Sequence, residues 1–167
     1  MTFRKARLQD VDAIMALVQT RIDWMNAMGL HQWNETDYFG RYPRNYWEKN
    51  IPCFLVGEEK GVVVVAIALY TEDVRWTRDG DYTGHHTGTA YYLHHLVTDT
   101  AFPGVGVQML HYVEQYAAEN GVCLLRLDSA VGNLSLEKYY TNLGYSACGT
   151  CHDQLYHGVL REKIILR

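Results

Sequence analysis

The chain contains 167 residues with a formal net charge of −4, and 48% of its residues are hydrophobic against 20% charged. This length supports one domain with a sizeable core, and this composition excludes bulk disorder. The acidic balance gives no electrostatic basis for nucleic acid or an anionic membrane as a partner, because both usually require a basic face. We therefore expect a single domain over residues 1–167.

The sequence also bears on location. The longest apolar run, Val62–Tyr70, is about half the length of a membrane span. Basic residues at the start are followed by an amphipathic stretch with charges instead of the apolar core of a secretory signal. Four cysteines are sparse for a secreted disulfide framework. We expect a cytoplasmic protein.

The first half of the chain predicts a short strand at residues 2–6 and a helix over 10–28. Apolar residues in that helix follow the i, i+3, i+4, i+7 spacing, which places them on one face. Aromatic residues crowd 30–50 without a clean period. Two strands are predicted at Cys53–Gly57 and Val62–Tyr70, and the second is apolar on both faces, as a central strand is.

The second half predicts an alternation of strands and helices. In chain order the predicted elements are a surface loop at 71–88, a strand at Thr89–Val97, a helix at Gly104–Glu119, a strand at Cys123–Asp128, a helix capped by Asn133 and ending at Gly144, and two closing strands at about 145–150 and 155–166. The pattern as a whole predicts an α+β fold.

A glycine-bearing turn joins the strand at Thr89–Val97 to the following helix. Gly104 and Gly106 lie at the start of that helix. Glycines let the backbone approach a bulky anion closely, and the unpaired N–H groups of a first helical turn bind phosphate with help from the helix dipole. A single Gly-x-Gly is equally consistent with an ordinary helix entry, so its structural context decides.

A second stretch, residues 133–145, gives a more specific indication of the protein family. Asn133 is followed seven residues later by Tyr140, and then by Gly144-Tyr145. Together with Gly104 and Gly106, this pattern resembles the GNAT superfamily of N-acetyltransferases. The two glycines fill the small-residue positions of its Gln/Arg-x-x-Gly-x-Gly/Ala signature. The resemblance covers roughly residues 88–147 well, and the amino-terminal half fits in order and type of elements.

The resemblance implies a fold and a co-substrate. The expected fold is a GNAT-like mixed, mostly antiparallel central sheet with a splayed parallel strand pair, flanked by helices on both faces. The strands at Thr89–Val97 and Cys123–Asp128 are expected to form this pair and to splay apart near Val97. The expected co-substrate is acetyl-coenzyme A, with no metal. The residues implied to bind it are Leu96, Val97, Ala101, Phe102, Gly104, Val105, Gly106, Val107, Asn133 and Tyr140.

One position departs from the family pattern. Ala101 stands where the family usually has Gln or Arg, and Phe102-Pro103 replace the common Gly-Lys or Gly-Arg. Backbone N–H groups still allow phosphate binding, and proline is tolerated in a first helical turn. The loss of a basic residue leaves a second hypothesis open, a non-catalytic module that binds an acyl-coenzyme A as a sensor or assembly partner.

The resemblance implies direct attack of a neutral amine on the thioester in a ternary complex, without an acyl-enzyme. A general acid protonates the leaving thiolate, and Tyr140 occupies the family's position for it. Core packing is the alternative role for this tyrosine. For the general base we prefer His94, because a histidine titrates near neutral pH and alternation places it with Tyr92 and Leu96. A half-buried or surface position is the alternative for both His94 and His95.

Two other groupings of side chains suggest metal chemistry. Cys148 and Cys151 have zinc-knuckle spacing, and His152 and His157 could complete such a site, but no second cysteine pair follows. A third hypothesis is a metal-binding protein built on the pairs His85-His86 and His94-His95. The alternative is that these histidines belong to a polar loop without a metal.

The acceptor is the least determined partner. We expect a small-molecule or peptide amine, contacted by Trp33 and Tyr92, because the region after the first helix commonly shapes the family's acceptor pocket. Core cover is the alternative role of the aromatic segment 30–47. Fold does not fix the substrate. A homodimer is a further expectation, since dimers are common.

Overall fold

The computed structural model describes residues 1–77, 80–82, 86–152 and 156–165. It comprises two compact units, the first made of Met1–Leu69 and His95–Tyr112, the second of Tyr70–His94 and Val113–Arg167. Hydrogen bonding links the strands in the order β1-β2-β3-β5-β6-β8-β7-β4. Strand β5 (Ala90–Thr98) and helix α5 (Val105–Glu119) each contribute to both units. That the whole chain acts as one domain stays a prediction.

The sheet of the first unit is antiparallel over β1 (Thr2–Lys5), β2 (Phe54–Glu59) and β3 (Val62–Tyr70). Lys60 and Gly61 form the turn between β2 and β3 with φ of 51° and 81°. Such angles suit glycine and make this a tight hairpin. Residues Val63–Leu69 are all buried, which confirms the expected central position of this strand.

The helices of the first unit cover both faces of its strands. They are α1 (Val11–Ala27), α2 (Tyr38–Arg41), α3 (Arg44–Asn50) and the short 3-10 turns Leu8–Asp10, Trp33–Glu35 and Ile51–Cys53, besides the first half of α5. Phe3 of β1 stacks on Tyr112 of α5, at 5.0 Å between ring centroids. Phe54 of β2 packs on Trp47 of α3, at 5.8 Å. Since Phe3 pairs with Gly57, Phe54 points to the opposite face.

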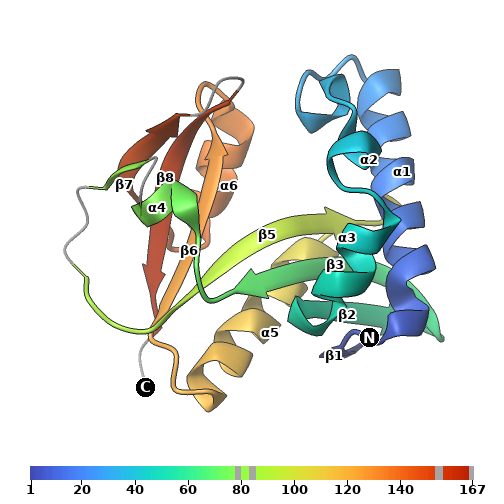
Figure 1. The fold of residues 1–167 in the computed structure, drawn as a ribbon, viewed down its shortest axis with the longest axis horizontal. Helices are drawn as coiled ribbons and strands as arrows, with labels where there is room; N and C mark the ends of the chain where they lie inside the picture. The colour runs from blue at the N-terminus through green and yellow to red at the C-terminus, as the bar shows by residue number, and fades with distance from the viewer. Residues whose placement is uncertain (78–79, 83–85, 153–155, 166–167) are drawn as a thin grey trace. The chain divides into compact units, whose positions relative to one another are not determined.

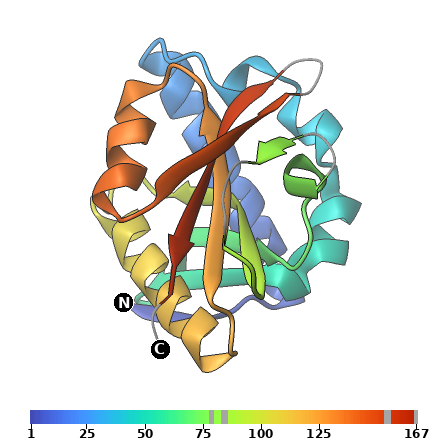
Figure 2. The ribbon, with the colours of Figure 1, turned by 90° about the vertical axis from the view of Figure 1, so that its left-hand side faces the viewer.

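The second unit contains β4 (Gly80–Tyr82), β6 (Leu124–Ala130), β7 (Ser146–His152) and β8 (His157–Ile164), with helices α4 (Val74–Thr77) and α6 (Leu134–Asn142). Strand β5 pairs with β6 in parallel from Ala90↔Leu124 to Tyr92↔Arg126. Every other pair of strands for which the register is described is antiparallel. Helix α6 packs beside β6 (Figure 1), and the β7–β8 hairpin follows it (Figure 2). The expected mixed fold is confirmed.

Two expectations for this unit need correction. The segment 71–88 is not only a loop, because it contains α4 and β4, two elements too short to leave a periodic pattern in the sequence. The parallel ladder ends at Tyr92, earlier than the expected splay near Val97. His95 adopts a left-handed φ of 53°, which interrupts the regular strand just beyond the ladder. No helix in the described part of the chain is long and apolar enough to cross a membrane.

The environment of Tyr145 leads to a prediction about the free energy of unfolding. Its side chain is only 1% exposed, and its hydroxyl has no hydrogen-bond partner among the described residues. A buried unpaired hydroxyl costs about 1–3 kcal/mol. Tyr145→Phe is therefore expected to keep or raise the free energy of unfolding, with a Tm about 2–4 °C higher for each kcal/mol gained.

Tyr156→Phe is the contrasting control, measured by the same denaturant and thermal unfolding. The Tyr156 hydroxyl donates to Asp128 Oδ2 at 2.6 Å. Removing a hydrogen bond to a charged group is expected to cost about 1.5–3 kcal/mol. A Tyr145→Phe protein destabilised as much as the Tyr156→Phe protein would contradict the assignment of an unpaired hydroxyl.

Candidate active site

The loop between β5 and α5 is shaped by Asp99. The Asp99 side chain accepts the backbone N–H of Ala101 at 2.8 Å, and its carbonyl accepts the N–H of Phe102 at 3.2 Å. The chain then turns at Gly104, which has φ of 82°. The glycine-bearing turn that the sequence predicted is confirmed, and the hydrogen bonds of Asp99 hold the residues that precede it.

The N–H groups of this loop fall into two sets. Those of Val105 and Val107 bond to the carbonyl oxygens of Phe102 and Gly104, at 3.2 and 3.1 Å. Those of Gly104 and Gly106 have no hydrogen bond among the described residues. These two donors lie at the N-terminus of a 15-residue helix, where the helix dipole favours an anion. The N–H of Ala101, which we expected to contribute, is engaged by Asp99 instead.

The strand residues before the loop differ in exposure. Val97 is buried and Leu96 is half-buried. Both lie in the first unit with the loop residues Ala101 to Val107, whereas Asn133 and Tyr140 lie in the second. Their joint contact with a coenzyme stays a prediction.

His95 occupies an aromatic cage in the first unit. The hydroxyl of Tyr38 lies 2.6 Å from Nδ1 and that of Tyr46 lies 2.9 Å from Nε2. The rings of Tyr42 and Trp47 approach to 4.8 and 5.2 Å between centroids. The aromatic residues of 38–47 therefore pack around a half-buried, hydrogen-bonded histidine. This arrangement matches the alternative given above for the aromatic segment, core cover, and the alternative given for His95, a half-buried position.

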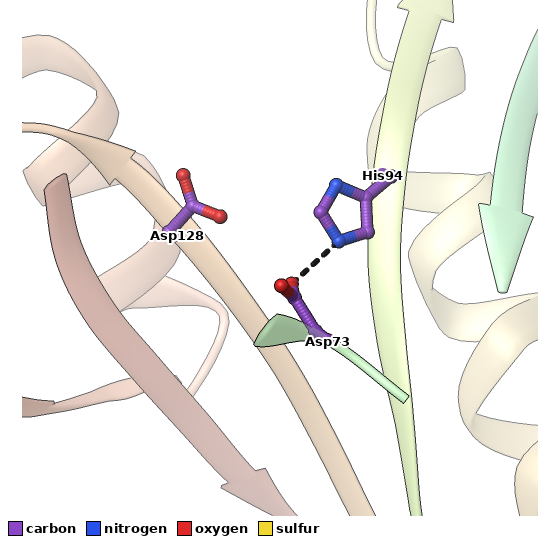
Figure 3. Close-up of side chains that lie close together, drawn as sticks. All are labelled: Asp73, His94 and Asp128. Carbon is purple, nitrogen blue, oxygen red and sulfur yellow. Dashed lines mark hydrogen bonds and ion pairs between the residues drawn. The ribbon is translucent and has the colours of Figure 1, made fainter. Parts of the chain in front are cut away.

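His94 lies in the second unit and has a different environment. Its Nε2 lies 2.7 Å from Oδ2 of Asp73, which precedes α4 (Figure 3). The side chains are 22% and 7% exposed, respectively. Burial opposes ionisation of Asp73, but the hydrogen bond and charge of His94 outweigh it, so the pKa of Asp73 lies below its ordinary value of 3.8.

Asp128, on β6, faces the same cluster (Figure 3). Its carboxylate accepts from the Arg75 guanidinium at 3.2 Å and from the Tyr156 hydroxyl at 2.6 Å. Ligand-type atoms of Asp73, His94 and Asp128 lie within 4.8 Å of one another, the only such group of three in the described part of the chain. Arg75, which is paired with Asp128, places a positive charge beside this cluster, and that charge disfavours a bound cation.

Helix α6 presents the residues of the second motif. Asn133 caps it, with its side-chain oxygen accepting the Leu136 N–H at 3.0 Å, as predicted. The ring of Tyr140 is half-buried and packs edge-on against Tyr139 and Tyr145, at 5.1 and 5.7 Å. Burial raises the pKa of Tyr140 well above its ordinary value, so the phenol keeps its proton through the neutral range.

The two expected acceptor residues belong to different units, Trp33 to the first and Tyr92 to the second. Trp33 begins a 3-10 turn, and its side chain lies outside what the structure describes. Tyr92 is 7% exposed in a core cluster with Trp76 and Leu160, and its hydroxyl accepts from Arg126 at 3.0 Å. This environment gives Tyr92 a packing role, and substrate contact by either residue stays a prediction.

The other groupings that suggested metal chemistry are described in part. Burial raises the pKa values of Cys148 and Cys151 to about 11, which favours the inert thiols over metal-binding thiolates. His86 lies 2.6 Å from Glu162, a buried carboxylate. His85 lies outside the described residues.

Sequence reasoning missed Asp73, Arg75 and Asp128. Asp73 lies in the segment interpreted as a loop, and nothing local distinguishes it. Asp128 carried a usable signal, because the run Leu124-Leu125-Arg126-Leu127-Asp128 places two charged residues on one face of an otherwise apolar strand. Charged residues at alternate positions of a buried strand indicate a polar site on that face.

Comparison with solved structures identifies close likenesses of fold. An acetyltransferase of the GNAT family from Streptococcus agalactiae is 19% identical with a TM-score of 0.80, covering 99% of this chain and 96% of that one. A GNAT-family acetyltransferase from Listeria monocytogenes is 23% identical with a TM-score of 0.74, at 98% and 94% coverage. The PaiA N-acetyltransferase of Thermoplasma acidophilum, solved with coenzyme A, is 15% identical with a TM-score of 0.73, at 98% coverage of both chains.

A search of curated proteins finds no match. The model of the acetyltransferase (GNAT) family matches residues 18–145, which include β5, the glycine turn, α6 and the Asp73–His94 pair. The chain therefore belongs to the GNAT family of acetyltransferases.

Proposed function

We propose that the protein is an N-acetyltransferase that transfers the acetyl group of acetyl-coenzyme A to a primary amine. The main support for this proposal is a pair of N–H groups at the start of α5, those of Gly104 and Gly106, that make no hydrogen bond among the described residues. The chain is also a member of the GNAT family. These N–H groups are suited to the coenzyme's pyrophosphate, because a helix N-terminus favours an anion. Two relatives of this fold, PaiA and the N-acetylglutamate synthase of Neisseria gonorrhoeae, were solved with coenzyme A.

The proposed reaction needs two proton transfers. The amine nitrogen attacks the thioester carbonyl directly in a ternary complex, forming a C–N bond as the C–S bond breaks. His94 accepts the proton that leaves the amine, and Tyr140 donates a proton to the departing thiolate. Each such transfer is typically worth ~10²–10⁴-fold in rate. The raised pKa of Tyr140 supports the donor role, because the phenol is protonated at neutral pH.

The remaining residues are proposed to hold the co-substrate. Leu96 and Val97 would pair with the pantetheine arm through their backbone. The loop from Ala101 to Val107 would hold the pyrophosphate through the N–H groups of Gly104 and Gly106. Asn133 can contribute only its amide nitrogen, because its oxygen caps α6. The acceptor is a small-molecule or peptide amine, with Trp33 and Tyr92 as proposed contacts, and we propose no nucleic acid, membrane or metal as partner. A cytoplasmic location and a homodimer also stay proposals.

A non-catalytic acyl-coenzyme A module is the second candidate function. The loop between β5 and α5 favours this second function, because the Ala101 side chain has no hydrogen-bond donor and its backbone N–H donates to Asp99. Such a module would still bind the coenzyme but would lack turnover.

Two measurements separate these functions. Acetyl-coenzyme A at a hundred times its Kd should stabilise the protein by about 2.7 kcal/mol in thermal unfolding. A thiol-release assay with acetyl-coenzyme A against a panel of amines should then show turnover with at least one acceptor. Binding without turnover on any amine would support the module, and no stabilisation at all would contradict both functions. Zinc in place of the coenzyme is the control for metal binding.

A further inference from the structure

Asp73 is held by two independent sets of hydrogen bonds. Its Oδ1 accepts the Arg75 N–H at 2.9 Å, and its carbonyl accepts the Trp76 N–H at 3.1 Å. These bonds start α4 and fix the direction of the carboxylate. Its Oδ2 is then left to meet Nε2 of His94 at 2.7 Å. The carboxylate is thus oriented before any substrate arrives.

An ionised carboxylate accepts hydrogen bonds and donates none, so the proton between Asp73 and His94 belongs to Nε2. In neutral His94 the lone pair then resides on Nδ1, which faces away from Asp73 (Figure 3). A hydrogen bond to one ring nitrogen of a histidine decides which nitrogen can accept a proton. The tautomer of His94 is therefore set by Asp73.

Two other described residues lie near His94 and have different roles. Asp128 is occupied by Arg75 and Tyr156, as described above. Tyr70 packs its ring against the imidazole at 5.4 Å. Asp73 bonds directly to the imidazole.

We propose that Asp73 is a positioning residue that holds His94 in the Nε2–H tautomer, so that Nδ1 takes the proton of the acceptor amine. This inference rests on the proposed function only for its second half. The tautomer can be measured without any acceptor. The amine's proton moves to Nδ1, the C–N bond forms, and the thiolate that leaves is protonated separately.

The test is Asp73→Asn, studied by nitrogen NMR of the imidazole and by steady-state kinetics. The introduced amide keeps its oxygen towards the Arg75 N–H, because that donor remains, and so turns its NH2 towards Nε2. Nε2 must then accept, and the proton moves to Nδ1. We expect wild-type His94 to show a protonated Nε2, and the variant to show a protonated Nδ1. His94→Gln assigns the signals.

In the kinetic arm, Asp73→Asn is expected to lower kcat by about 10–100-fold, the range found when the hydrogen-bond partner that orients a metal-bound histidine is lost. KM for acetyl-coenzyme A should change little. Asp37→Asn is the matched control, because Asp37 caps α2 by accepting the Gly40 N–H at 2.9 Å in the other unit. Asparagine is also a good cap, so both variants should fold with similar Tm.

The outcomes are distinct. An unchanged His94 tautomer in Asp73→Asn would overturn the proposal, and so would a switched tautomer with undiminished kcat. Stoichiometric Zn²⁺ binding that Asp73→Asn abolishes would also overturn it, by assigning the cluster to a cation. A wild-type protein with the expected tautomer but no turnover on any amine supports the positioning by Asp73 and contradicts the proposed function.

Discussion

Replacing Tyr140 by phenylalanine is expected to lower kcat by ~10²–10⁴-fold while leaving the affinity for acetyl-coenzyme A nearly unchanged. The phenol is protonated at neutral pH because burial raises its pKa, so it can donate to the leaving thiolate. A loss confined to kcat indicates an interaction made in the transition state, whereas a rise in KM alone indicates uniform binding. Steady-state kinetics and calorimetric titration measure the two quantities.

Tyr139→Phe is the control for this prediction. Tyr139 is also half-buried on α6 and packs edge-on against Tyr140 at 5.1 Å. Phenylalanine keeps the ring at either position, so both variants should melt close to the wild-type temperature. Undiminished turnover in Tyr140→Phe, under conditions where chemistry limits the rate, would leave Tyr140 a packing residue.

Gly106→Asp is expected to weaken acetyl-coenzyme A binding by about a hundredfold or more without destabilising the protein. A carboxylate in the first turn of α5 would lie near the proposed pyrophosphate, and like charges about 4 Å apart near a surface repel by several kcal/mol. The same carboxylate suits the helix dipole, so Tm should stay level or rise. Gly106 is the better position for this test, because Gly104 has φ of 82° and any side chain there strains the loop.

Gly106→Asn separates charge from size, since its side chain has the same shape without the charge. Calorimetric titration of both variants should show the large loss only for aspartate. Part of that loss should be recovered at high ionic strength, because salt screens exposed charges. Equal affinities of the aspartate and asparagine variants would remove the pyrophosphate from the start of α5.

The elements whose signals are local were predictable. The turn at Gly104 depends on the backbone angles of one glycine, and the cap at Asn133 depends on one side-chain hydrogen bond. The buried strand β3 depends on the hydrophobicity of a few consecutive residues. Each of these signals can be recognised in the sequence. The parallel pairing of β5 with β6, which the family resemblance implied, is confirmed. Elements of three or four residues, such as α4 and β4, were missed, because they are shorter than the windows in which periodicity can be recognised.

By itself the sequence determined the family, the longer strands and helices with their order, and the glycine turn before α5, because these depend on motifs and on periodic patterns along the chain. Only the tertiary structure decided which histidine carries an acidic partner. His94 and His95 are adjacent and chemically identical, yet one meets Asp73, 21 residues away, and the other meets Tyr38, 57 residues away. Side chains at neighbouring positions of a strand point to opposite faces of the sheet. The residues that they contact there are set by packing between segments that are distant in the sequence.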